Sequence, residues 1–225
     1  MSSNFNLSCV LFDLDGTLVD TAPDLIACLN QALLQYDLTA MADKQIKPFI
    51  SLGAAAMINK SVGDHVSQHT QKKILNTMLD CYQDNIAQYS RFFSGINETL
   101  ETIESLDLKW GIVTNKRKRF TQPLVEALKL TQRAACIISG DTTAHSKPHP
   151  EPLYTACSQA RVNPEQCVYI GDARHDIDAG NKANMKTLAA VYGYLTPDDK
   201  PDTWGADALI ASPEQLTSWI TSTCH

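Results

Sequence analysis

Short apolar runs, separated by amphipathic helical patterns, recur from one end of this chain to the other. The runs are continuous rather than alternating, which is typical of strands buried on both faces of a parallel sheet. Between them, stretches such as 96–106 and 123–130 place apolar residues on one helical face. Strands that alternate with helices predict βαβ units and an α/β fold with a doubly wound, mainly parallel, Rossmann-like sheet. The predicted strands are residues 9–12, 110–113, 136–139, 167–170, 187–191 and 208–210.

Residues 19–91 depart from this alternation of strands and helices, because they contain helical patterns but no convincing strand. Apolar residues recur at helical spacing within 25–36 and again within 74–86. We therefore expect a small α-helical cap domain over 19–91, inserted into an α/β core that is made of 1–18 and 92–225.

The charge balance and the cysteines restrict the partners and the compartment. Nineteen basic residues against 25 acidic ones give a net charge of −6, which argues against a nucleic-acid or anionic-membrane partner. No apolar stretch approaches the length that spans a membrane, and the N-terminus lacks the pattern of a signal peptide. The seven cysteines include no C-x-x-C pair, as expected of reduced thiols. We expect a cytoplasmic protein.

Two acidic residues follow the first predicted strand. Asp13 and Asp15 lie two positions apart, and Gly16 permits a sharp turn directly after them. Ligands of open α/β sheets bind at the carboxyl ends of the strands. Two carboxylates at such a position are costly unless a cation or a reaction uses them. This pair is the first candidate for catalysis.

Three further polar sites follow later predicted strands or lie in the loops after them. Thr114 and Asn115 offer a hydroxyl and an amide that could hold an anion. Lys147 lies in a loop stiffened by neighbouring prolines, and Asp172 and Asp176 are four positions apart after the fourth predicted strand. Carboxylate oxygens from this last pair and from the first acidic site suit Mg²⁺.

These sites carry a resemblance that spans nearly the whole chain, to the haloacid dehalogenase-like hydrolase superfamily. Its four motifs are matched by Asp13-x-Asp15-Gly-Thr-Leu, Thr114-Asn115, Lys147 and Gly171-Asp172-x-x-x-Asp176. Within the superfamily the chain resembles the phosphoglycolate phosphatase-like branch, which has a helical cap after the first motif. Looser stretches, among them 147–152 and 192–194, resemble a subgroup of bacterial proteins. Some of these are named phosphoglycolate phosphatase and others N-acetylmuramic acid 6-phosphate phosphatase.

The resemblance implies a phosphatase that works through an aspartyl-phosphate intermediate. Asp13 would be the nucleophile, and Asp15 would protonate the leaving alcohol and then accept a proton from water. The resemblance also implies an Mg²⁺ cofactor held by Asp13, the backbone carbonyl of Asp15 and Asp172, with Asp176 binding directly or through water. The phosphoryl oxygens would be neutralised by Thr114, the Asn115 backbone and Lys147.

The cap is where the resemblance places substrate selection. Residues 50–57 resemble the cap loop that faces the active site, where Gly53 would allow close backbone approach and Ser51 could hydrogen-bond the substrate. Alanines at 54–56 stand where related sequences often have an arginine or another polar residue, so the pocket has room for more than a two-carbon acid. The alternative for this segment is a helix N-terminus packed on its neighbour.

The predicted reaction is hydrolysis of a small phosphorylated metabolite, 2-phosphoglycolate to glycolate and phosphate. N-acetylmuramic acid 6-phosphate or another sugar phosphate is the alternative substrate. A phosphomutase of the same superfamily and a non-catalytic phosphate-binding module are less favoured. The latter would be expected to have lost Asp13 or Asp15, and both are present. A monomer or a small homo-oligomer is expected.

Overall fold

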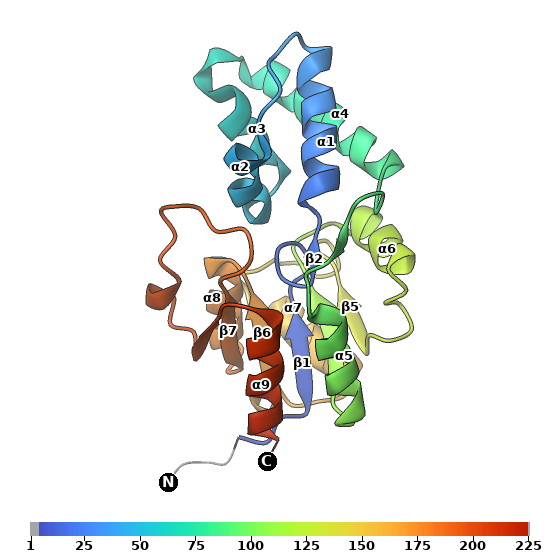
Figure 1. Cartoon of the computed structure of the whole chain (residues 1–225), viewed down its shortest axis with the longest axis vertical. Coiled ribbons are helices and arrows are strands. Elements are labelled where there is room, and N and C mark those ends of the chain that lie inside the picture. Colours follow the sequence, from blue (N-terminus) through green and yellow to red (C-terminus); the bar gives the residue numbers. More distant parts are fainter. Residues whose placement is uncertain (1–4, 225) are drawn as a thin grey trace.

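The computed structural model describes residues 5–224 and contains a six-stranded sheet in which all neighbouring strands are parallel. The strand order β5-β4-β1-β6-β7-β8 places the first strand in the middle of the sheet (Figure 1). From β1 the chain adds β4 and β5 on one side of the sheet and then β6, β7 and β8 on the other side. This order confirms the predicted doubly wound α/β fold. The strands are β1 (Cys9–Phe12), β4 (Lys109–Val113), β5 (Cys136–Ile138), β6 (Cys167–Gly171), β7 (Lys186–Ala190) and β8 (Ala208–Ile210).

Alternate residues of β1 face opposite sides of the sheet. Val10 and Phe12 lie in an apolar cluster with residues of α5 (Ile96–Ser105) and α9 (Pro213–Thr223). Cys9 and Leu11 lie in a second cluster with residues of α7 (Glu151–Ala160) and α8 (Arg174–Lys182). Helices therefore cover both faces of the strand, and this double burial explains why its sequence is a continuous apolar run.

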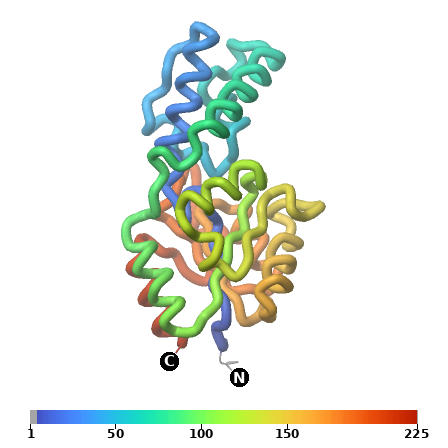
Figure 2. Tube along the Cα trace, turned by 90° about the vertical axis from the view of Figure 1, so that its right-hand side faces the viewer, coloured from blue at the N-terminus to red at the C-terminus, as the bar shows by residue number. Residues whose placement is uncertain are grey.

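The chain between β2 (Val19–Asp20) and β3 (Arg91–Phe92) contains helices and no strand. The two short strands pair antiparallel, so the outgoing and returning segments run side by side. The helices share their own apolar cluster, which Phe120 and Tyr194 of the sheet-bearing part also join. Figures 1 and 2 show them as a unit at one end of the molecule, beyond the carboxyl end of β1. The unit consists of α1 (Ala22–Gln35), α2 (Asp43–Ile46), the 3₁₀ helix η1 (Lys47–Leu52), α3 (Ala54–Val62), the 3₁₀ turn η2 (Gly63–His65) and α4 (Gln68–Asp84).

The helix after β4 differs from the predicted one at 123–130. The helix α6 (Lys118–Ala127) begins earlier and carries Pro123 inside it. The sequence pattern favoured a start at this proline because proline is enriched in the first turn of helices. Two 3₁₀ turns, η3 (Pro164–Gln166) and η4 (Pro201–Thr203), complete the elements.

No helix within residues 5–224 combines the length and the apolar character needed to cross a membrane.

Candidate active site

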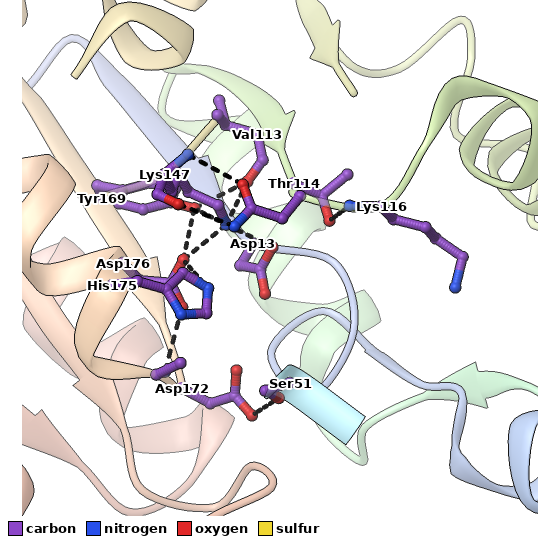
Figure 3. A network of polar contacts seen from close by, with 12 residues as sticks. Asp13, Ser51, Val113, Thr114, Lys116, Lys147, Tyr169, Asp172, His175 and Asp176 are labelled. Carbon is purple, nitrogen blue, oxygen red and sulfur yellow. Dashed lines mark hydrogen bonds and ion pairs between the residues drawn. The ribbon is translucent and has the colours of Figure 1, made fainter. Parts of the chain in front are cut away.

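The predicted site residues gather at the carboxyl ends of three neighbouring strands, β4, β1 and β6. Thr114, Asp13 and Asp172 are the first residues after these strands (Figure 3). They are far apart in the sequence, but the strand order makes them neighbours, because parallel strands end at the same edge of the sheet. All three side chains are buried.

Lys147 connects these strand ends, although it comes from the loop between β5 and α7. Its side chain is fully buried, and its Nζ donates hydrogen bonds to Asp13 Oδ1 at 2.8 Å and to Asp176 Oδ1 at 2.6 Å. The same Nζ lies 2.7 Å from the Tyr169 hydroxyl and 3.1 Å from the Val113 carbonyl oxygen. The ammonium is therefore surrounded by oxygens and held in one position.

The Asn115 side chain fixes the backbone that carries this lysine. Its Nδ2 donates to the Lys147 carbonyl oxygen at 3.1 Å, and its Oδ1 accepts from the Lys147 N–H at 3.0 Å. Both ends of the amide are thus used within the protein, and the Asn115 backbone stays the predicted group for an anion.

Asp172 has two carboxylate oxygens in different situations. Oδ2 accepts hydrogen bonds from Ser51 Oγ and from the Tyr194 N–H, both at 2.8 Å. Oδ1 is buried and has no hydrogen-bond partner among residues 5–224. A Cβ at Gly16 would collide with the Asp172 carboxylate, so only glycine permits this close approach. One oxygen of Asp172 is therefore fixed and the other is left for a ligand.

The charges at the strand ends do not balance. Burial raises the pKa of Asp13 to about 6, against the opposing effect of Lys147. Burial, together with the carboxylates of Asp13 and Asp176, raises the pKa of Asp172 well above its usual range. Burial also disfavours an ionised Asp176, but Lys147, His175 and the Ala173 N–H together outweigh burial and lower the pKa of that carboxyl. Three buried carboxylates share one ammonium, so the site lacks positive charge.

A divalent cation would supply that charge. One oxygen each of Asp13, Asp172 and Asp176 lies within 4.8 Å of the others, and all three residues are buried. The donors are all oxygens, which suits a hard cation. The unpaired Asp172 Oδ1 is available to such an ion, whereas both oxygens of Asp176 already accept hydrogen bonds, from Lys147 and from the Ala173 N–H. The residues present fit a bound metal.

Asp15 lies on the side of the site that faces the helical unit. Its Oδ1 accepts from Lys116 Nζ at 2.9 Å and from Thr21 Oγ1 at 2.5 Å. Lys116 is a site residue that the sequence did not predict, although it directly follows Thr114 and Asn115. Its position there is the signal that could have found it.

A cavity of about 450 Å³ lies between the helical unit and these strand ends. Asp13, Asp15 and Thr114 line it from the sheet, and Gly53 and its neighbouring alanines line it from η1 and α3. Gly53 has a φ of 92°, a conformation that side chains rarely adopt, and it joins the two helices there. Ser51 also lines the cavity, but its hydroxyl is hydrogen-bonded to Asp172.

Comparisons with known proteins agree with this geometry. The model of the family described as haloacid dehalogenase-like hydrolase matches residues 10–190. An N-acetylmuramic acid 6-phosphate phosphatase of Pseudomonas aeruginosa is 40% identical over 210 residues, which are 93% of each chain. A phosphoglycolate phosphatase of Xanthomonas campestris pv. campestris is 39% identical over 207 residues, 92% of this chain and 93% of that one. The crystal structure of a "predicted phosphoglycolate phosphatase" from Haemophilus somnus superposes with a TM-score of 0.84 at 25% identity, covering 98% of this chain and 100% of that one.

Proposed function

This chain belongs to the haloacid dehalogenase-like hydrolase family and is a phosphatase, and we propose that it hydrolyses a small phosphomonoester through an aspartyl phosphate at Asp13. The observation that carries the proposal is the meeting of three groups at adjacent strand ends. A buried carboxylate, Asp13, is held by a buried ammonium, Lys147, next to an Asp172 oxygen that has no partner among the described residues. A nucleophile, a positive charge and a metal ligand are what phosphoryl transfer requires.

The proposed reaction has two halves. A carboxylate oxygen of Asp13 attacks phosphorus, the bond from phosphorus to the leaving oxygen breaks, and Asp15 gives that oxygen a proton. Water then attacks the phosphorus of the aspartyl phosphate while Asp15 takes a proton from this water, the bond from phosphorus to the Asp13 oxygen breaks, and inorganic phosphate leaves. Thr21 and Lys116 hold the Asp15 carboxylate at the cavity for both transfers. The phosphoryl oxygens are bound by Thr114, the Asn115 backbone and Lys147.

We propose Mg²⁺ as the cation of this site. Asp13, Asp172 and the Asp15 backbone carbonyl would hold it. Asp176 would act through water, since both of its carboxylate oxygens already accept hydrogen bonds. When bound, the cation offsets the repulsion between the Asp13 carboxylate and the phosphate oxygens.

The cavity favours the larger of the two substrates named for the relatives. Its volume of about 450 Å³ lies in the range, about 300–1,000 Å³, that accommodates ligands well beyond a two-carbon acid. Apolar side chains of Leu75, Leu79 and Phe120 line part of it, and a sugar ring can pack on such a wall. We therefore propose N-acetylmuramic acid 6-phosphate as the substrate, with 2-phosphoglycolate as the second candidate.

We further propose that 19–91 acts as a cap domain on a core of 1–18 and 92–225. Its separate apolar cluster and its paired connecting strands support this division.

We propose the cytoplasm as the site of action. The seven cysteines are all free thiols, which suits a reducing compartment.

The test is release of inorganic phosphate, with and without Mg²⁺, from a panel of phosphomonoesters. The panel holds N-acetylmuramic acid 6-phosphate, 2-phosphoglycolate, hexose 6-phosphates and β-glucose 1-phosphate. We expect Mg²⁺-dependent release with a preference for the first, and none from Asp13→Asn. The matched control is Asp43→Asn, a change at an exposed position in α2 that should keep full activity.

Two outcomes would contradict the proposal. Conversion of β-glucose 1-phosphate into another sugar phosphate, with little free phosphate, would identify a phosphomutase. Binding of the esters by folded protein without any turnover would identify a phosphate-binding module.

A further inference from the structure

One buried hydroxyl in the cavity wall lacks a well-placed partner. Tyr82, on α4, is 1% exposed, and its hydroxyl makes no hydrogen bond of ordinary geometry with any of the residues 5–224, although the Lys116 ammonium lies close enough to interact with it. A buried phenol normally has a hydrogen-bond partner, because losing water without replacement costs free energy. Tyr82 also lines the cavity, so a ligand there can supply the missing partner.

A cation lies beside this tyrosine. The side chain of Lys116 is 8% exposed, and its Nζ stands 4.5 Å from the centre of the Tyr82 ring. An ammonium can donate three hydrogen bonds, and the one found for this Nζ within the described chain goes to Asp15. Lys116 lines the same cavity and has donors to spare for a ligand.

The surroundings of this pair are mostly apolar. Leu25, Leu79 and Phe120 line the cavity on the same side, from α1, α4 and α6. The Tyr82 and Phe120 rings pack against each other, with centroids 5.5 Å apart. A charged hydrogen bond gains strength in such a wall, because little water competes for it.

We propose that Tyr82 and Lys116 form a subsite for a second anionic group of the substrate, a carboxylate, which lies away from the phosphate. The subsite rests on the proposed function and makes these two residues determinants of specificity for phosphomonoesters that also carry a carboxylate. A carboxylate brings one negative charge, which a hydroxyl and an ammonium shared with Asp15 can bind through hydrogen bonds. A second phosphate would bring more charge than this lysine can balance, because it already pairs with Asp15.

Arg117 and Arg119 also line the cavity, both are exposed, and Arg119 is the competing anchor that we test. The Arg119 guanidinium lies 4.4 Å from the Phe120 ring. Water therefore screens its interaction with an anion more than it screens that of Lys116. A test must separate Arg119 from Lys116.

The experiment compares pairs of substrates of which one carries a carboxylate; the first pair differs in a whole lactyl ether, and the second differs at the carboxylate alone. N-acetylmuramic acid 6-phosphate is paired with N-acetylglucosamine 6-phosphate, and 2-phosphoglycolate with 2-hydroxyethyl phosphate. For Tyr82→Phe we expect kcat/KM to fall about tenfold or more on the acids, since a hydrogen bond to a charged group is lost. On the neutral partners it should change by less than about twofold, because the hydroxyl has nothing to bind there. Lys116→Met should lower kcat/KM on both members of a pair, because Lys116 also holds Asp15, and the loss should be larger on the acids.

Controls separate the subsite from a structural role. Tyr89→Phe removes a hydroxyl from an exposed tyrosine and should change neither substrate of a pair. Tyr82→Phe should unfold at no lower temperature than the wild type, because the Tyr82 hydroxyl has no hydrogen bond of ordinary geometry to lose among the described residues. An equal loss on acidic and neutral substrates would overturn the subsite, as would a carboxylate-selective loss in Arg119→Ala but not in Tyr82→Phe.

A binding measurement keeps the inference independent of turnover. In Asp13→Asn protein, calorimetric titration with N-acetylmuramic acid 6-phosphate should show weaker binding when Tyr82→Phe is added, and N-acetylglucosamine 6-phosphate should show no difference. Equal affinities for the acid would reject the subsite even if the wild type released no phosphate. Absence of phosphate release alone would count against the proposed function and not against the subsite.

Discussion

The site joins two regions that are built differently. At the strand ends, Lys147 is fully buried and is hydrogen-bonded to two carboxylates that are themselves buried. On the side of the helical unit, the ion pair between Lys47 and Asp20 is 41% and 28% exposed, and the cavity wall is largely apolar. The strand ends of the sheet hold buried charged groups in fixed positions, whereas the helical unit contributes a mostly apolar cavity wall with a few polar contacts. We therefore propose that the first region carries out the chemistry and that the second selects the substrate.

The largest difference should appear when the nucleophile is changed. Asp13→Asn should reduce turnover by a factor of about 10⁴ or more, because an amide cannot form the acyl phosphate. Steady-state phosphate release measures this loss. The variant keeps the bond between Lys147 and Asp176, so circular dichroism should remain that of the folded protein. Wild-type turnover in this variant would remove Asp13 from the reaction.

Removing the buried ammonium should cost stability where removing the exposed one does not. Lys147→Met leaves Asp13 and Asp176 buried without their cation, and breaking a buried pair in this way costs about 3–5 kcal/mol. Lys47→Met, in contrast, should cost at most about 1 kcal/mol. Urea unfolding of both variants in the absence of Mg²⁺ measures the difference. If the two variants lost similar free energies of unfolding, the charges at the strand ends would be held no more rigidly than those of the helical unit.

Metal binding should stabilise the strand ends. Mg²⁺ at about a hundred times its dissociation constant should add about 2.7 kcal/mol to the free energy of unfolding. For a chain of this size this corresponds to a rise in Tm of about 5 °C or more. Asp172→Asn should lose most of the rise, because its unpaired oxygen lies among the three candidate ligands. An unchanged Tm on addition of Mg²⁺ to the wild type would contradict the metal site.

The sequence predicted the sheet and its strand ends well for a physical reason. The central strands β1, β4 and β6 are buried almost throughout, so each one reads in the sequence as a continuous apolar run, and the site residues follow directly after its end. The start of α6 was harder to place, because Pro123 resembles a first-turn proline although it lies inside the helix. The local sequence predicts an element's bounds only where neighbouring residues, and not contacts with distant segments, determine them.

Contacts between distant segments could not be derived from the sequence. Tyr169 is one apolar-looking residue within β6, and nothing near it indicates that its hydroxyl meets Lys147. Tyr82 looks like any core residue of an amphipathic helix, and its place in the cavity wall depends on how α4 packs against the sheet-bearing part. Gly53 and Ser51 were expected at the substrate, and the structure places both at the cavity while directing the Ser51 hydroxyl to Asp172.

The smallest expected effect concerns this link between the two regions. Ser51→Ala removes the donor to Asp172 Oδ2 and leaves the Tyr194 N–H as its partner. The fixed oxygen then becomes less constrained, and Mg²⁺ affinity should fall by about fivefold, the equivalent of one net hydrogen bond of about 1 kcal/mol. Ser61→Ala is the matched control, because among the described residues its hydroxyl donates to the Met57 carbonyl oxygen alone, within α3. Titration calorimetry with Mg²⁺ distinguishes the two variants. If Ser51→Ala bound the ion as tightly as Ser61→Ala, the helical unit would not contribute to the metal site, and the two regions would act independently.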